Sequence, residues 1–311
     1  MKKPQRLLSD KDRINKTKIG NAVFNIINIS IFLIFTFICV FPFYYIFINT
    51  ISSNELSSAG KILFYPKEIH FNNYIEVIKL KGIIHAGLIS IARTVLGTFL
   101  TLLGASFLGY VFTKKEYWKR KFWYRFVVIS MYFNAGLIPW FVTMKTVGLY
   151  NNFLAYILPT AVVPFYVILF KTFVEQIPAS LEESVQIDGG GYATRFIRII
   201  IPLTTPILAT IAVFSCAAQW NSFMDTLFLV SSEKLFTLQY IMYQYLNQVN
   251  ALATLMRTSQ STNANVAAMN LLTPTSIRMT ISFVVVLPIL AVYPFLQRYF
   301  VKGIMIGAIK G

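Results

Sequence analysis

The chain has 311 residues, of which 56% are hydrophobic and 13% are charged, whereas about 25% of the residues of an ordinary soluble domain carry a charge. Together with a mean hydropathy of +0.61, this composition excludes a water-soluble globule and makes the lipid bilayer the solvent for much of the chain. The net charge of +16 would suggest a nucleic-acid partner for a soluble protein, but in a membrane protein the positions of basic residues report orientation.

Six stretches with few charged residues are long enough to cross about 30 Å of hydrocarbon, which takes about 20 residues of α-helix. They cover approximately residues 22–51, 84–112, 126–144, 152–170, 202–230 and 279–296. Arg93 interrupts the second stretch and Asp225 lies near the end of the fifth, and we expect each to lie within reach of a membrane interface. The first stretch exceeds the roughly 7 to 15 apolar residues of a signal peptide, so we interpret it as a retained anchor. The sequence therefore predicts an all-α integral membrane protein with six transmembrane helices.

Lysine and arginine are unequally divided between the two sets of connecting segments. One set has seven before the first predicted helix, six between the second and third, three between the fourth and fifth, and three after the sixth, against eight in the other set. Because basic segments stay on the cytoplasmic side, both termini are expected there. Residues 1–21 would form a basic cytoplasmic tail and residues 22–311 the transmembrane domain, with anionic membrane lipid and not nucleic acid as the partner of this charge.

The same topology places two long loops on the outer face, at about residues 52–82 and 231–278. Loops longer than about 15 residues are usually functional or disordered. The second loop is polar and rich in amides, so a partner on the outer face is one interpretation and a passive linker is the other.

The predicted helices lack the groups of residues that catalysis or ion coupling requires. The sequence has no cluster of His, Cys, Asp and Glu with metal-ligand spacing and no P-loop, so we predict no catalytic residue, no metal site and no cofactor. Any driving energy would then come from another subunit, or the chain is passive. An ion-coupled or passive secondary transporter and a membrane-embedded enzyme remain as alternatives, although both need ionisable groups at membrane depth, which are scarce here.

Some amide and aromatic side chains occur at or near membrane depth and are candidates for contact with a polar solute. They are Asn134, Trp140, Trp220, Asn221 and Phe223. Aromatic faces beside amides suit sugars, but aromatic residues also line membrane interfaces and polar groups also join neighbouring helices. Both roles stay open for each residue.

The most informative segment lies between the fourth and fifth predicted helices, at about residues 175–201. Ser180 followed by Glu183 has the spacing of a capping box, which predicts that a helix begins at Leu181. Glu182 and Glu183 in its first turn favour the positive end of the helix dipole.

Three consecutive glycines, 189–191, follow this short helix and can adopt the positive φ that ends it. A second helix is predicted from Tyr192. Because an isolated helix of about two turns is marginal in water, the first helix needs a surface on which to dock.

This segment resembles the EAA loop of ABC-importer permeases. The matching residues are Glu183-Ser184-Val185, Asp188-Gly189 and Ile199-Ile200-Ile201-Pro202. The sequence departs from the family pattern at four positions, with Ser184 and Val185 for two alanines, Gly190 for the usual alanine and Ile201 for leucine. Three more stretches are similar to carbohydrate permeases of the maltose-permease type: Asn134–Pro139, Trp220–Phe223 and Gln297–Gly311. Within that type, residues 134–141 and the long outer loop before the sixth predicted helix most resemble permeases for lipoprotein or complex-polysaccharide uptake.

The resemblance implies a type I ABC importer permease fold in the bacterial plasma membrane, with six transmembrane helices and both termini cytoplasmic. It implies a permease subunit, not itself an enzyme, that forms half of the translocation pathway of an ATP-driven importer for carbohydrate, in particular an oligosaccharide. The implied partners are a second homologous permease, an ATPase dimer that hydrolyses ATP, and an extracellular solute-binding protein. The implied contact with the ATPase comprises Glu182, Glu183, Asp188, Gly189 and Gly190.

Overall fold

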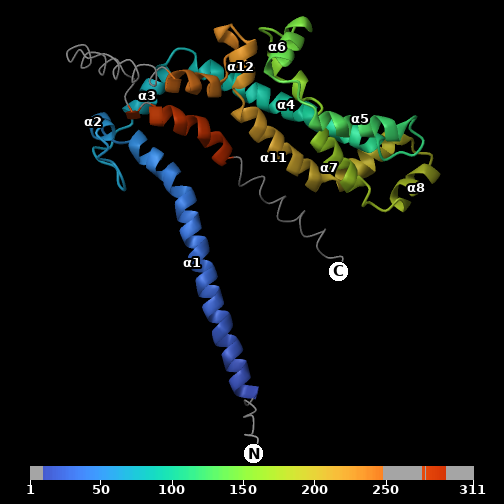
Figure 1. Ribbon diagram of the computed structural model, residues 1–311, viewed down its shortest axis with the longest axis horizontal. Helices are drawn as coiled ribbons and strands as arrows, with labels where there is room; N and C mark the ends of the chain where they lie inside the picture. Colours follow the sequence, from blue (N-terminus) through green and yellow to red (C-terminus); the bar gives the residue numbers. More distant parts are fainter. Residues whose placement is uncertain (1–9, 248–274, 277, 292–311) are drawn as a thin grey trace, which may run out of the picture.

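The computed structural model describes residues 10–247, 275–276 and 278–291, and every regular element within them is helical. Two long helices dominate (Figure 1): α1, Asp10–Thr50, and α4, Ile83–Val111. Between them lie α2, Asn54–Ser58, and α3, Asn72–Lys79. The first predicted outer loop is therefore partly helical.

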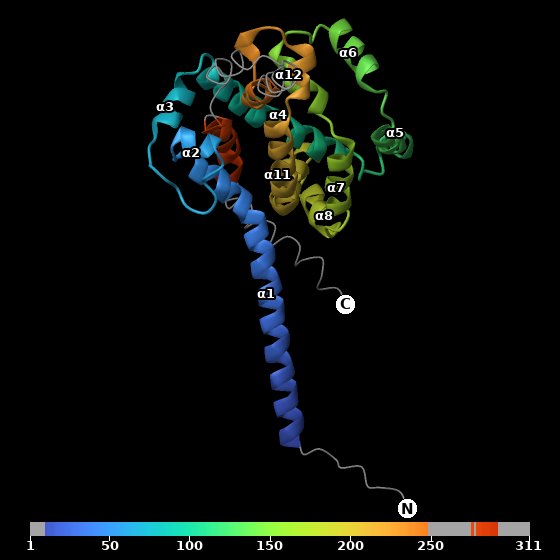
Figure 2. The same cartoon turned by 60° about the vertical axis from the view of Figure 1, so that its left-hand side comes forward.

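Helix α1 extends away from the rest of the molecule. Figures 1 and 2 both show it as a single rod that meets the other elements only near its C-terminal end. Large apolar side chains along it, such as Phe32, Ile34 and Phe37, are more than 60% exposed. An apolar surface of this extent needs lipid or another protein chain to cover it.

The packed centre of the molecule consists of α4, α7 (Pro164–Val174) and α11 (Thr205–Asn221). A glycine lets α4 approach α7 closely: a Cβ atom at Gly109 would lie 2.8 Å from the Phe170 ring and 3.1 Å from the Val167 carbonyl oxygen. Small residues at helix contacts are typical of membrane proteins, because close backbones gain van der Waals contact.

The third predicted transmembrane helix is not one helix. Residues 126–144 are divided between α5, Arg120–Tyr132, and α6, Leu137–Thr146. The chain breaks where Gly136 has a φ of +87°, a conformation that glycine adopts easily and other residues rarely. The prediction of a continuous helix is wrong here, because hydropathy and length do not register a local break.

The fourth and fifth predicted helices are bent. Residues 153–160 meet α7 at 43°, and residues 192–203 meet α11 at 77°. Two of the described helices are long and apolar enough to cross a membrane alone, and the two bent pairs bring the number to four. Of the sixth stretch the structure describes Arg278–Ala291, while residues 292–296 lie outside the described residues.

Short elements join these helices. They are η1 (Phe153–Tyr156), η2 (Leu158–Thr160), α8 (Ser180–Ile187), α9 (Tyr192–Arg195), the π-helical turn η3 (Phe196–Ile200), α10 (Ile201–Leu203), α12 (Met224–Leu229), η4 (Glu233–Leu235) and a helix at 238–247. Figure 2 shows α8 at the lower end of α7 and α11, on the side toward which α1 extends, whereas α6 and α12 lie at the opposite end. The segment around α8 and the break after α11 are therefore at opposite ends of one helical core.

Candidate coupling segment and solute path

Helix α8 covers Ser180–Ile187 and begins one residue earlier than the sequence predicts. Its N-cap residue is Ala179, which already has helical φ and ψ and whose carbonyl accepts from the N–H groups of Glu182 and Glu183. Ser180 thus lies inside the first turn, and no side chain caps this end of the helix. The predicted capping box of Ser180 and Glu183 is wrong, because its hydroxyl must come from the residue just outside the helix.

The two glutamates of the first turn have different surroundings. The Glu182 carboxylate pairs with the Lys114 ammonium and accepts a hydrogen bond of 3.0 Å from the Tyr110 hydroxyl. The Lys114 ammonium also lies 4.2 Å from the centroid of the Tyr110 ring. Glu183 is exposed, and no side chain in the described residues pairs with it. One glutamate therefore attaches α8 to the end of α4, and the other points outward.

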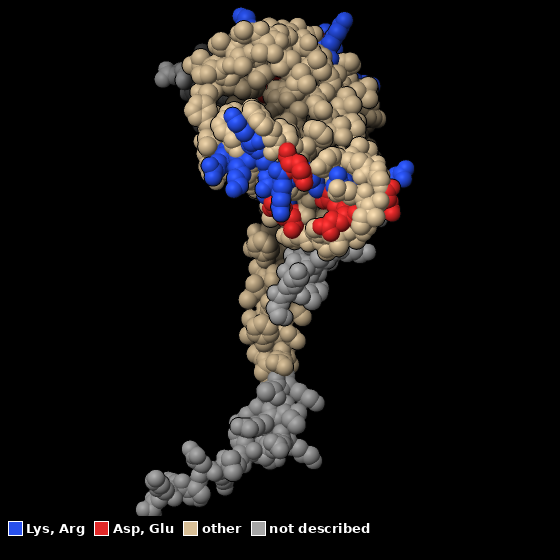
Figure 3. Space-filling view, turned by 90° about the vertical axis from the view of Figure 1, so that its right-hand side faces the viewer, with Lys and Arg blue, Asp and Glu red and all other residues tan. Residues whose placement is uncertain are grey.

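Charged side chains gather at this end of the molecule. Figure 3 shows acidic groups lying beside a larger group of basic ones. Asp188, at the C-cap of α8, is also exposed. The outward face of α8 is therefore acidic and accessible to a partner.

A second contact holds α8 against the helix that follows it. Helix α9 begins at Tyr192, which confirms the predicted start of the second helix. The buried Arg195 guanidinium donates to Gln186 Oε1 at 3.3 Å and lies 4.2 Å from the centroid of the Tyr192 ring. A buried cation is costly without partners, and the partners of Arg195 come from both helices, Gln186 from α8 and Tyr192 from α9. The guanidinium therefore ties the end of α8 to α9.

The chain reverses between the two helices through glycines. Gly189 has a φ of +81°, which confirms the prediction that a glycine ends the helix. The Gly190 N–H donates to the Val185 carbonyl at 2.8 Å, and a Cβ atom at Gly190 would lie 2.5 Å from Val185 Cγ1. Two departures from the family pattern thus touch each other, and valine fits at one position because the other has no side chain.

Gly190→Ala is therefore expected to destabilise the protein by about 1–3 kcal/mol, the usual cost of overpacking. Adding Val185→Ala should recover only part of this loss, because the new methyl also meets the Val185 carbonyl oxygen at 2.8 Å. Thermal unfolding of the detergent-purified protein measures both effects. Gly191→Ala is the matched control, since a Cβ atom there has no atom within 4 Å. Equal losses of stability for Gly190→Ala and Gly191→Ala would contradict the packing argument.

At the opposite end of the core, two of the predicted solute-path residues lie in one cluster. Helix α11 ends at Asn221, and two residues separate it from α12. Around this break the Gln239 amide donates to Asn221 Oδ1 at 3.2 Å, and the Phe223 ring stacks on Tyr243 with the centroids 4.7 Å apart. The break thus combines amide groups with flat aromatic faces. Gln239 and Tyr243 belong to this cluster, although neither is among the solute-path residues predicted from the sequence.

The other three predicted solute-path residues have contacts within the chain. Trp220 is buried, and its indole N–H donates to the Val285 carbonyl at 2.8 Å, which leaves no free donor for a solute. Trp140 packs against the apolar cluster of η1 and α12. Asn134 lies in the break between α5 and α6, where its Oδ1 accepts from the Gly136 N–H at 2.9 Å. Asn221 and Phe223 are the pair that the helix break brings together.

Behind the break lies a buried network of charged and polar groups. Arg93 of α4 is 1% exposed. Its guanidinium pairs with the Asp225 carboxylate at 2.5 Å and donates to the Ser222 carbonyl at 3.1 Å. It also donates to Gln219 Oε1 at 3.2 Å and lies 4.5 Å from the centroid of the Tyr156 ring. The guanidinium therefore donates to a carbonyl just beyond α11, where a helix C-terminus favours a cation. It also pairs with Asp225 in the first turn of α12, where a helix N-terminus favours an anion.

In the sequence, Arg93 and Asp225 are isolated charged residues of two different apolar stretches, and the structure shows that they form an ion pair. One signal was available: ionisable residues within apolar stretches usually pair with one another. No comparable signal pointed to Tyr110 or Lys114 as partners of Glu182. Within the residues that the structure describes, no group of three or more His, Cys, Asp or Glu side chains could hold a metal ion.

Comparison with known proteins identifies relatives along nearly the whole chain. No protein-family model matches the sequence. The chain is 33% identical over 298 residues to Protein LplC of Bacillus subtilis (strain 168), covering 96% of this chain and 98% of the relative. It is 30% identical over 294 residues to the polygalacturonan/rhamnogalacturonan transport system permease protein YtcP of the same organism, covering 94% and 99%.

The fold has a relative of known structure as well. A bacterial ABC transporter involved in the import of the acidic polysaccharide alginate contains a chain that matches with a TM-score of 0.78 and 26% identity, over 95% of this chain and 100% of that chain. The YtcP relative is named as a transport system permease, which is a transport component and not an enzyme. The apolar helices of this chain agree with a protein that crosses the membrane several times. The chain belongs to the permease subunits of ABC importers.

Proposed function

We propose that this permease forms half of the solute pathway of an ATP-driven importer for carbohydrate, with an oligosaccharide as its substrate class. Relatives named for polygalacturonan/rhamnogalacturonan and arabinooligosaccharide transport support this proposal. The observation that carries the coupling role is the position of α8, which is attached to α4 through Glu182 while Glu183 is exposed. A short helix that is attached to the core on one face and exposed on the other is suited to transmit a movement of a bound partner to the core.

In this proposal the chain has six membrane-spanning segments with both termini in the cytoplasm. Helix α8 docks on one subunit of an ATPase dimer, Glu183 and Asp188 meet basic groups there, and Gly189 and Gly190 hold the turn. Closure of the ATPase dimer moves α8 and switches the pathway between inward-open and outward-open packing. A second homologous permease completes the pathway and, with lipid, covers the exposed apolar surface of α1. An extracellular solute-binding protein delivers the substrate to the outer loops.

The helix break after α11 is the proposed point of contact with the solute. The stacked rings of Phe223 and Tyr243 offer a flat apolar face, and the amides of Asn221 and Gln239 offer donors and acceptors. Sites for polar ligands commonly combine aromatic surface with a few placed polar groups. A sugar ring has both kinds of surface, hydroxyl groups at its edge and C–H groups on its faces.

The substrate class can be tested with the complete importer in vesicles, by measuring ATP hydrolysis with the binding protein and a panel of glycans or peptides. We expect stimulation by an oligosaccharide, and we expect Phe223→Leu to lower that stimulation about tenfold, since removal of an aromatic ring from a binding site costs roughly 1–2 kcal/mol. Phe99→Leu, at an exposed position of α4, is the matched control. Stimulation by peptides alone would contradict the carbohydrate assignment.

A secondary transporter would require an ionisable group that is free to bind the coupling ion. Asp225, in the buried network behind the helix break, is already paired with Arg93 and is therefore not free for this role. Uptake that continues after removal of the ATPase subunits would overturn the ATP-driven mechanism itself.

A further inference from the structure

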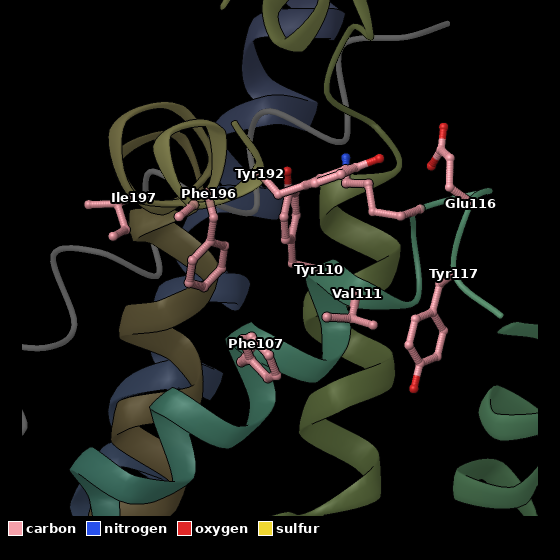
Figure 4. A pocket seen from close by; sticks show the side chains of 10 residues that line it. Phe107, Tyr110, Val111, Glu116, Tyr117, Tyr192, Phe196 and Ile197 are labelled. Carbon is pink, nitrogen blue, oxygen red and sulfur yellow. The ribbon is translucent and has the colours of Figure 1, made fainter. Parts of the chain in front are cut away.

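Two pockets adjoin each other at the end of α4 nearest to α8. The first has a volume of ≈ 470 Å³ and is lined mainly by aromatic and aliphatic side chains, among them Phe107, Val111, Tyr117, Tyr192, Phe196 and Ile197. Figure 4 shows Phe196 and Ile197 on one side of the pocket, Tyr117 on the other, and Phe107 and Val111 along the wall between them. This pocket has the size and the apolar lining of a site for a ligand chain.

The second pocket has a volume of ≈ 480 Å³ and a lining of opposite character. Its charged residues are all basic: Lys115, Lys119, Arg120, Lys121 and Arg125. None of the five has an ion pair within the described part of the chain. Tyr117 lines both pockets, so an apolar site and a strongly cationic site share a wall. A cationic concavity of this kind attracts an anionic group.

The side chains around these pockets indicate the depth of the site relative to a membrane. Trp118 is 67% exposed, and Phe122 and Trp123 in the first turn of α5 are also exposed. Exposed aromatic residues beside lysine and arginine are typical of the level of the lipid headgroups. The basic pocket therefore lies at the level of the lipid phosphates, and the apolar pocket lies beside the last turns of the apolar helix α4.

We infer that the two pockets together bind one anionic phospholipid of the inner leaflet, with its phosphate among the basic side chains and an acyl chain in the apolar pocket. The leaflet rests on the orientation in the proposed function. Basic pockets on the cytoplasmic side of membrane proteins recognise anionic headgroups in this way. The tails of the chain do not complement the site, since residues 1–9 and 292–311 each carry three basic residues and no acidic one.

The site is connected to the coupling segment. Tyr110 and Lys114 line the apolar pocket, and the same two residues hold Glu182 of α8. Tyr192 also lines the pocket and contacts Arg195, which holds the other end of α8. A lipid in this site therefore touches both attachments of the coupling helix.

The test is retention of lipid by the purified permease complex in nanodiscs of phosphatidylcholine with a minor fraction of phosphatidylglycerol, read by native mass spectrometry. Retained phosphatidylglycerol should fall about tenfold or more in the variant Lys115→Gln, Lys121→Gln, Arg125→Gln, as expected when three cations that bind the headgroup are removed. The matched control is Lys61→Gln, Lys67→Gln, Lys79→Gln, which removes the same charge from the opposite end of the molecule and should retain the lipid.

Further arms separate the parts of the inference. Ile197→Ser should weaken retention of long-chain phosphatidylglycerol, while dihexanoyl phosphatidylglycerol and inorganic phosphate should not compete for the site. Equal retention by the two triple variants, or equal binding of the short-chain lipid, would overturn the site. Complete displacement of the lipid by added ATPase subunits would also overturn it and assign the basic surface to that protein. Because the readout does not use ATP hydrolysis, failure of coupling would leave the lipid result intact.

Discussion

Arg93→Met is expected to lower the free energy of unfolding by about 3–5 kcal/mol, because it leaves the Asp225 carboxylate in a buried site without its cation. The Asp225 side chain is only 15% exposed, so water cannot replace the guanidinium fully. A loss of this size is a large part of the roughly 5–15 kcal/mol that stabilises a folded domain. Unfolding of the purified chain in SDS, followed by tryptophan fluorescence, measures the change.

A double-mutant cycle provides the control. Arg93→Met combined with Asp225→Leu should cost less than the sum of the single losses, because the second change removes the unpaired charge. Arg93→Lys should be intermediate, since an ammonium cannot make the forked contacts of a guanidinium. Single losses below about 1 kcal/mol that add in the double variant would show that the pair does not matter for stability.

The second large effect is expected at the outer face of α8. Glu183→Ala should reduce substrate-stimulated ATP hydrolysis by about tenfold or more, because truncation of one partner in a charged contact between proteins costs roughly 2 kcal/mol or more. The stability of the isolated chain should change by less than about 1 kcal/mol, since the exposed side chain contributes chiefly through the helix dipole. ATP hydrolysis by the reconstituted importer and thermal unfolding of the chain measure these two quantities.

Glu182→Gln is the matched variant, one residue away with the same loss of charge. It should destabilise the chain through the loss of its ion pair with Lys114, and a further Lys114→Met change should add little, because the two residues share one interaction. A Glu183→Ala importer with undiminished coupling would remove that residue from the ATPase contact. A Glu182→Gln effect that adds fully to Lys114→Met would contradict the attachment of α8 to α4.

The local features of the chain were predictable because they depend on neighbouring residues. Hydropathy identified the long apolar helices α1 and α4, and the glycine after Asp188 marked the end of α8. Predictions that required the exact phase of a turn were less successful. The prediction of a capping box at Ser180 was wrong because Ala179 is already helical. The prediction of one helix over the third apolar stretch was wrong because the chain breaks at Gly136.

The sequence by itself determined that this protein belongs in a membrane, and it indicated the ABC-importer permease family, because composition, periodicity and short motifs are carried by residues close together in the chain. Only the tertiary structure decided which glutamate of α8 faces outward, that Val185 fits against Gly190, and that Arg93 pairs with Asp225. These two charged residues are 132 positions apart. Their pairing depends on the packing of α4 against α11 and α12, and the pattern of charges along a single segment contains no information about that packing.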